Sequence, residues 1–97
     1  MKIELKKFGT TLISRQSGRE AFSAFRPSLE NLNKEENIEV DFSDVITFSP
    51  SWGDEFLRPL HEKYNGRISF LNTTNPSVKV TLELLEEINK VKFDIKS

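Results

Sequence analysis

The chain has 97 residues, and 14 Lys and Arg against 15 Asp and Glu give a formal net charge of −1. This length suits a single domain over residues 1–97, and the near-neutral charge argues against a general nucleic-acid or anionic-membrane binder. The chain has no Cys and one His, which argues against disulfides, metal sites and an acyl-transfer triad, so we expect no cofactor and no enzyme. No apolar signal segment follows Met1 and no run approaches the roughly 18 apolar residues of a membrane span, so we expect a cytoplasmic protein.

The first strands are predicted near the N-terminus. Ile3 and Leu5 alternate with charged residues, as in a half-buried strand. Residues 8–10 are typical of a turn, after which residues 11–14 are expected to pair back as a second strand.

A helix is predicted next. Ser17 and Glu20 have the spacing of a capping box, which predicts a helix starting there. Pro27 lies inside the helical pattern and predicts either a kink near Arg26 or a new helix from Pro27 onward. The apolar residues at helical spacing are Phe22, Phe25, Leu29 and Leu32.

The central segment gives the clearest strand, over residues 38–42, extended past a turn or bulge towards Phe48. A helix start follows. Either Ser49 is its N-cap with Pro50 as the first helical residue, or Ser51 is the cap with Asp54 three residues on. The apolar face of this helix comprises Phe56, Leu57, Leu60 and Tyr64.

The C-terminal third predicts a strand over residues 67–71, a turn-forming loop over 72–77 and a helix over about 77–90. Residues 91–97 form a weak strand or a tail. Strand–helix alternation predicts an α/β fold, a mixed sheet of about four to five strands with helices packed against it. The apolar face of the last helix is expected to contain Val78, Leu82, Leu85 and Ile88.

The segment VDFSDVITFSPSWGDEFL, residues 40–57, resembles the central part of STAS domains, the sulfate-transporter and anti-sigma-factor-antagonist family. It is more similar still to the STAS-like domain of unknown function, with Phe8-Gly9 and Ser14-Arg15 matching an upstream signature. This resemblance implies a STAS-like fold and a binding module of bacterial regulation. Its implied partner is a protein, of which a kinase-type ATPase regulator is one candidate.

The resemblance also implies a phosphorylation switch at the opening of the second helix. Aligned residue by residue, Ser49 stands at the Asp position of the family motif and Pro50 stands at the acceptor position, with Ser51 following. The acceptor is therefore missing in register. Ser49 and Ser51 are interpreted either as helix caps or as modified residues, and a phosphate there would meet repulsion from Asp54 and Glu55 in the predicted first turn.

Four consecutive residues of this segment are candidate partner-binding residues. Trp52 is either a surface anchor or a core residue, and Gly53 either lets a partner approach or relieves crowding. Asp54 and Glu55 point in different directions on a helix, so an ion pair with Arg15 or Arg58 is favoured over shared acid–base chemistry.

The loop at residues 72–75, with Asn72 and Thr73, is either a second partner or ligand contact or a solvated turn. The leading hypothesis is a non-enzymatic interaction module that docks a partner through the helix start at residues 49–55 and this loop. The alternative is a small-ligand or nucleotide-binding sensor that uses the same helix start, although the chain has no Gly-rich phosphate loop.

Overall fold

Strands and helices form two layers in the computed structural model, which describes residues 1–96. A short 3₁₀ turn, η1 (Leu5–Phe8), lies between the first two strands. In chain order the other elements are β1 (Lys2–Glu4), β2 (Thr11–Leu12), α1 (Arg15–Leu29), β3 (Ile38–Asp41), β4 (Thr47–Phe48), α2 (Pro50–Lys63), β5 (Ile68–Leu71), α3 (Pro76–Asn89) and β6 (Asp94–Ile95).

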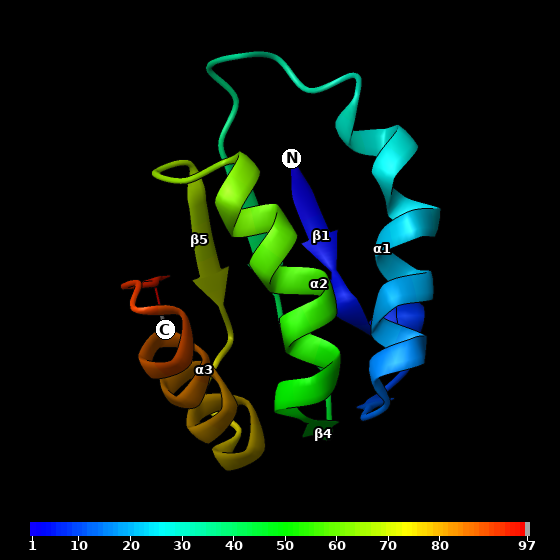
Figure 1. Ribbon diagram of the computed structural model, residues 1–97, viewed down its shortest axis with the longest axis vertical. Helices are drawn as coiled ribbons and strands as arrows, with labels where there is room; N and C mark the ends of the chain where they lie inside the picture. The colour runs from blue at the N-terminus through cyan, green and yellow to red at the C-terminus, as the bar shows by residue number, and fades with distance from the viewer. Residues whose placement is uncertain (97) are drawn as a thin grey trace.

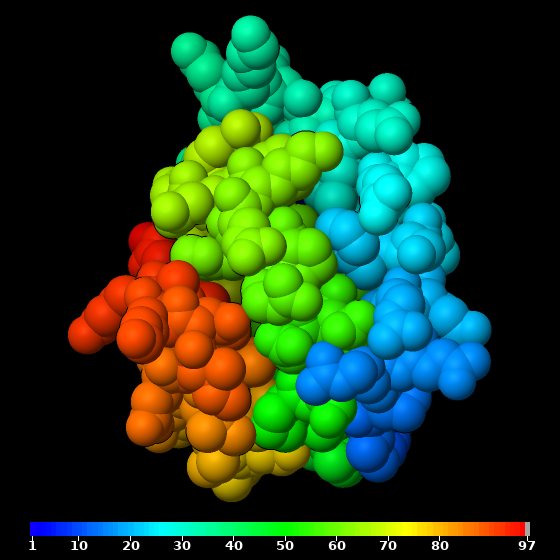
Figure 2. Space-filling model, viewed as in Figure 1, coloured from blue at the N-terminus to red at the C-terminus, as the bar shows by residue number. Residues whose placement is uncertain are grey.

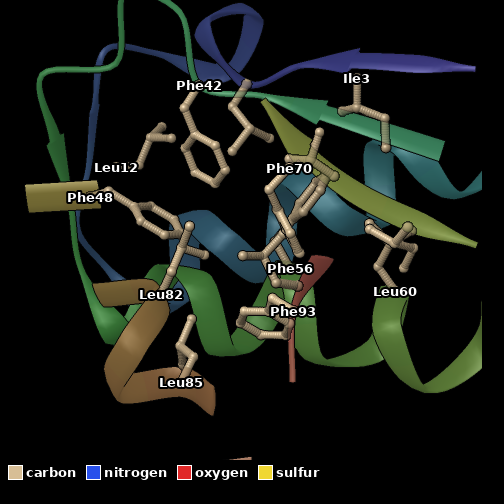
Figure 3. Close-up of a cluster of buried hydrophobic side chains, with 14 of the residues drawn as sticks. Ile3, Leu12, Phe42, Phe48, Phe56, Leu60, Phe70, Leu82, Leu85 and Phe93 are labelled. Atoms are coloured by element: carbon tan, nitrogen blue, oxygen red, sulfur yellow. The ribbon is translucent and has the colours of Figure 1, made fainter. Parts of the chain in front are cut away.

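The main sheet has the strand order β1-β3-β5-β6, and its pairings are all parallel. Ile3, Val40 and Phe70 lie in register on three neighbouring strands and are buried, whereas the preceding residues on two of these strands, Glu39 and Ser69, are more exposed. The three helices cover only the buried face, as Figures 1 and 3 show. The predicted α/β class is confirmed, with four strands in this sheet.

The predicted pairing of the first two strands is wrong. The 3₁₀ geometry of η1 brings residues three apart onto one side, so Leu5 is fully buried and Phe8 packs against the core. Gly9 follows with a φ of 131°, a conformation that favours glycine, and redirects the chain. β2 therefore pairs in parallel with β4, Leu12 opposite Phe48, as a separate two-stranded ladder.

The first helix begins earlier than the capping-box pattern predicts. Ser14 has extended backbone angles, and its side chain accepts a hydrogen bond from the Ser17 amide at 3.0 Å, so Ser14 and not Ser17 is the N-cap. The helix then runs without interruption through Pro27 to Leu29. The prediction of a new helix from Pro27 is wrong.

The core between the layers is rich in aromatic side chains, several of which Figure 3 shows directed from the strands and helices towards one another. Phe56 lies at the centre of the aromatic cluster that packs between α1 and α2. Its ring centroid lies 5.3 Å from Phe8, 5.7 Å from Phe22 and 5.0 Å from Trp52. Such contacts add to the burial free energy, which a chain of this size needs because its core is small.

The apolar face of α3 differs from the prediction in one residue. Val78, Leu82 and Leu85 are buried as expected, but Ile88 is 59% exposed. Thr81 takes part in the buried face instead, because its hydroxyl donates a hydrogen bond to the Phe48 carbonyl at 2.6 Å. An apolar residue is therefore left at the surface of this helix.

Candidate functional site

The start of α2 is held by Ser49, which is the N-cap, with Pro50 as the first helical residue. The first of the two predicted capping arrangements is confirmed. The Ser49 hydroxyl accepts a hydrogen bond from the Trp52 amide at 3.3 Å and donates one to the Ile13 carbonyl. Since the Ser49 amide also donates to the Leu12 carbonyl at 2.9 Å, this serine joins the start of α2 to the end of β2.

Trp52 is a core residue. Its side chain is fully buried and stacks on Phe56 with an interplanar angle of 18°, while Phe48 meets it edge-on at 6.1 Å. The interpretation of Trp52 as a surface anchor for a partner is therefore wrong, because a partner cannot reach it. Among the described residues its indole Nε1 is a buried polar atom without a hydrogen-bond partner.

Gly53 is likewise a packing residue. An added Cβ would lie 2.7 Å from a methyl carbon of Leu85 and 2.9 Å from the ring of Phe48. The space at Gly53 is already filled by this chain, so the prediction that a partner approaches the backbone there is wrong. The crowding that this glycine relieves comes from α3 and β4.

Asp54 and Glu55 form ion pairs with arginines, as the sequence predicts, and do not pair with each other. Arg15 Nη1 lies 3.0 Å from Asp54 and 2.9 Å from Glu55, Arg19 lies 3.0 Å from Glu55, and Arg58 lies 3.2 Å from Asp54. The hydrogen bonds from Arg19 and Arg15 lower the pKa of Glu55, and those to Asp54 and Glu55 raise the pKa of Arg15.

The two carboxylates are the fifth and sixth residues of α2, so the placement of both in its first turn is wrong. Their main partners are arginines of α1 rather than the amides at the end of their own helix. Arg15 and Arg19 therefore link the beginnings of α1 and α2 across the surface. The network thus places charged side chains beside the start of α2, where Ser51 is half-buried.

The loop after β5 is joined to β3 by a group of polar side chains. Asn72 has a φ of 56°, and its side-chain amide donates to Asp41 at 2.7 Å and to Ser43 at 2.8 Å. Thr73 is buried, and Asn75 caps α3 while its amide donates to the carbonyls that precede β4. The loop is therefore tied to its neighbours by hydrogen bonds, while Asn72 and Thr74 stay exposed as in a solvated turn.

Asp41 is the residue of this region that the sequence did not single out. Strand alternation places Asp41 on the same outward side as Glu39, yet Asp41 is only 4% exposed. The spacing of Asp41 and Ser43 was the available signal, since an aspartate at a strand end commonly accepts the amide two residues on. Here the Asp41 carboxylate accepts hydrogen bonds from the Ser43 amide at 3.0 Å and from the Ser43 hydroxyl at 2.8 Å.

These contacts predict a pH-dependent stability. Burial alone would raise the pKa of Asp41, but hydrogen bonds from Asn72 and from the amide and hydroxyl of Ser43, with the charge of Lys2, lower it from 3.8 to about 2. Because the folded-state pKa is the lower one, the carboxylate stabilises the fold above about pH 4, and this contribution is lost as the pH falls towards 2. It amounts to roughly 2 kcal/mol.

Urea unfolding between pH 2 and pH 7 measures this contribution. We expect the wild-type free energy of unfolding to fall by about 2 kcal/mol more than that of Asp41→Asn across this range, because the amide does not titrate there. Equal slopes for the two proteins would show that Asp41 does not make this contribution.

Among residues 1–96, no group of three or more His, Asp or Glu side chains is arranged to hold a metal ion. Within the same range, none of the helices combines the length and the apolar character needed to cross a membrane. The observed features are thus a parallel sheet with helices on one face and a second helix whose start is fixed by a serine cap, a buried indole and an arginine–carboxylate network.

This arrangement defines a small α/β domain with its helices on one face of a parallel sheet (Figure 1). The family model described as a STAS-like domain of unknown function matches residues 23–78, more than half of the chain, and the chain belongs to this family. The match runs from within α1 to the start of α3 and includes the whole of α2. No curated protein and no solved structure matches the chain.

Proposed function

We propose that this chain is a non-enzymatic protein-interaction module in regulation, which docks a partner protein beside the β2–β4 ladder and the start of α2. The observation that carries the proposal is the exposure of two isoleucines that flank this ladder. Ile13, directly after β2, is 51% exposed, and Ile46, directly before β4, is 64% exposed. Exposed apolar side chains with a polar rim are typical of protein interfaces.

Each isoleucine lies next to one of the two segments that the sequence singled out. The Ile13 carbonyl accepts the Ser49 hydroxyl at the start of α2. The Ile46 carbonyl accepts the side-chain amide of Asn75, from the loop after β5, at 3.0 Å. We define the ladder surface as Ile13, Arg15, Ile46 and Ser51, whose side chains are exposed or half-buried.

In this proposal the ladder surface takes the place of the buried Trp52. It keeps Ser51 and Arg15 from the predicted site and adds the two exposed isoleucines. Arg15 is held by Asp54 and Glu55, so little side-chain freedom is lost when a partner packs against it. Membership of the STAS-like family supports a binding role. The partner class, a kinase-type ATPase regulator, comes from the resemblance to anti-sigma-factor antagonists.

Isothermal titration calorimetry against a kinase-type ATPase of the same organism tests the proposal. We expect saturable binding by the wild type and at least roughly tenfold weaker binding by Ile13→Asp and by Ile46→Asp, since each variant buries an unpaired charge at the interface. Both positions are exposed, so the thermal midpoints should stay close to the wild type.

The control is Asn31→Asp, which adds the same single charge in the exposed segment between α1 and β3, at the opposite end of the molecule from β4 (Figure 1). It should bind like the wild type. Intact mass after incubation with ATP separates phosphorylation at Ser49 or Ser51 from docking alone. Unchanged affinity in both isoleucine variants would contradict the proposal.

A further inference from the structure

The outward side of α3 carries an apolar row that this chain leaves uncovered. Val80 is 63% exposed, Leu84 is 38% exposed and Ile88 is 59% exposed. They are spaced four residues apart, so they lie above one another along the helix. We call these three residues the α3 stripe. Figure 2 shows α3, in orange, at the edge of the helical layer beside α2, in green.

An acidic row runs beside the α3 stripe. Glu83 and Glu87 are each three residues after a stripe residue, which places them next to it on the helix surface. Both are exposed, and neither forms an ion pair with another residue within 1–96. Lys79 lies beyond the acidic row, on the side of the helix away from the stripe.

We propose that the α3 stripe docks a basic amphipathic helix of a partner protein. An apolar stripe recognises the apolar face of such a helix through residues three and four apart. Lys or Arg beside that face would then meet Glu83 and Glu87, which have no partners of their own in residues 1–96. Charge complementarity of this kind fixes orientation and excludes wrong partners.

The same charges disfavour the other occupants. If two copies packed antiparallel through their stripes around a two-fold axis, the acidic rows of both helices would lie on the same side of the contact, with four carboxylates together. An anionic lipid surface attracts helices with Lys and Arg beside the apolar face, the reverse of what α3 offers. A basic amphipathic helix would cover the α3 stripe with its apolar face and pair its Lys or Arg side chains with Glu83 and Glu87.

Fluorescence anisotropy with two labelled synthetic peptides tests the proposal. Both form amphipathic helices of roughly 18 residues, long enough to cover α3, with leucines on one face. One peptide carries lysines beside the leucines, and the other carries glutamates. We expect saturable binding of the lysine peptide and about tenfold weaker binding of the glutamate peptide to the wild-type chain.

Three variants test the α3 stripe, the acidic row and the ladder surface one at a time. The double variant Val80→Ser and Ile88→Ser should weaken binding of the lysine peptide by about tenfold or more, because it removes most of the exposed apolar area. Glu83→Gln with Glu87→Gln should remove the preference for the lysine peptide. Ile46→Ser removes an equally exposed isoleucine from the ladder surface and should leave the affinity for both peptides unchanged, which separates the α3 stripe from the ladder surface.

The outcomes that overturn the proposal are distinct. They are equal binding of the two peptides, binding that survives the double serine variant, or no saturable binding of the lysine peptide. A wild-type dimer that the double serine variant dissociates would assign the stripe to a second copy, and co-sedimentation with phosphatidylserine vesicles would assign it to a lipid surface. Circular dichroism establishes that each variant is folded.

Discussion

Replacement of Trp52 by alanine is expected to lower the free energy of unfolding by about 3–5 kcal/mol, the usual cost of removing a large buried aromatic side chain. Trp52 is fully buried and contacts aromatic rings from two other elements, Phe8 of η1 and Phe48 of β4, besides Phe56 of its own helix. Truncation would leave a cavity between α1, α2 and the β2–β4 ladder. Because this is the only Trp, unfolding in urea should be followed by circular dichroism rather than by fluorescence.

Trp52→Phe is the matched variant, because it keeps an aromatic ring against Phe56 and should cost clearly less than alanine. The indole Nε1 has no hydrogen-bond partner within the described residues, so its removal exposes no unsatisfied group elsewhere. A loss below 1 kcal/mol for Trp52→Ala, with weakened partner binding in a stable protein, would restore the interpretation of this residue as a surface anchor.

Gly18→Ala is the second substitution with a large expected effect, a loss of about 2 kcal/mol. Gly18 lies where α1 meets the start of α2, and an added Cβ would lie 2.6 Å from the Trp52 carbonyl oxygen and 3.0 Å from its Cα. These are backbone atoms of a helix that is fixed by the Ser49 cap, so the two helices would have to separate. Alanine's better helix propensity offsets only about 1 kcal/mol of this cost.

Two controls isolate the close contact. Ser23→Ala, on the exposed side of α1, tests helix propensity alone and should be neutral or slightly stabilising. Gly53→Ala meets side-chain ends of Leu85 and Phe48, which can move more easily than a backbone, and should cost less than Gly18→Ala. Wild-type stability in Gly18→Ala would contradict the close packing of α1 and α2.

The elements that local pattern determines were predictable from the sequence. The strand at residues 38–41 follows from strict alternation, and the serines around Pro50 limited the start of α2 to two capping arrangements, of which the structure has the one at Ser49. The N-cap of α1 was not predictable from the sequence, because Ser14 and Ser17 both have suitable side chains. Only the path of the chain from β2 into the helix decides between them. The same path determines that β2 pairs with β4, a contact between distant segments that local periodicity does not encode.

The contacts around the start of α2 were predictable in part. The arginine–carboxylate pairs followed from charge and helix geometry, whereas the direction of Trp52 did not, because a residue in the first turn can face either the solvent or the core. Asp41 was missed since its burial depends on Asn72, which lies far along the chain. Ile88 fitted a buried helical stripe by spacing, yet it is exposed, whereas Thr81, two turns earlier on the same face of α3, is buried against Phe48.

Hydrogen exchange of the chain, alone and in complex with a kinase-type ATPase, tests the proposed docking most directly. Amides that a partner covers exchange more slowly, and the comparison reports on every segment at once. We predict slowed exchange at residues 10–15 and 46–51, which contain the ladder surface, with no change at residues 31–37. A complex in which exchange slows only outside the ladder surface, or the absence of any complex, would contradict the proposed function.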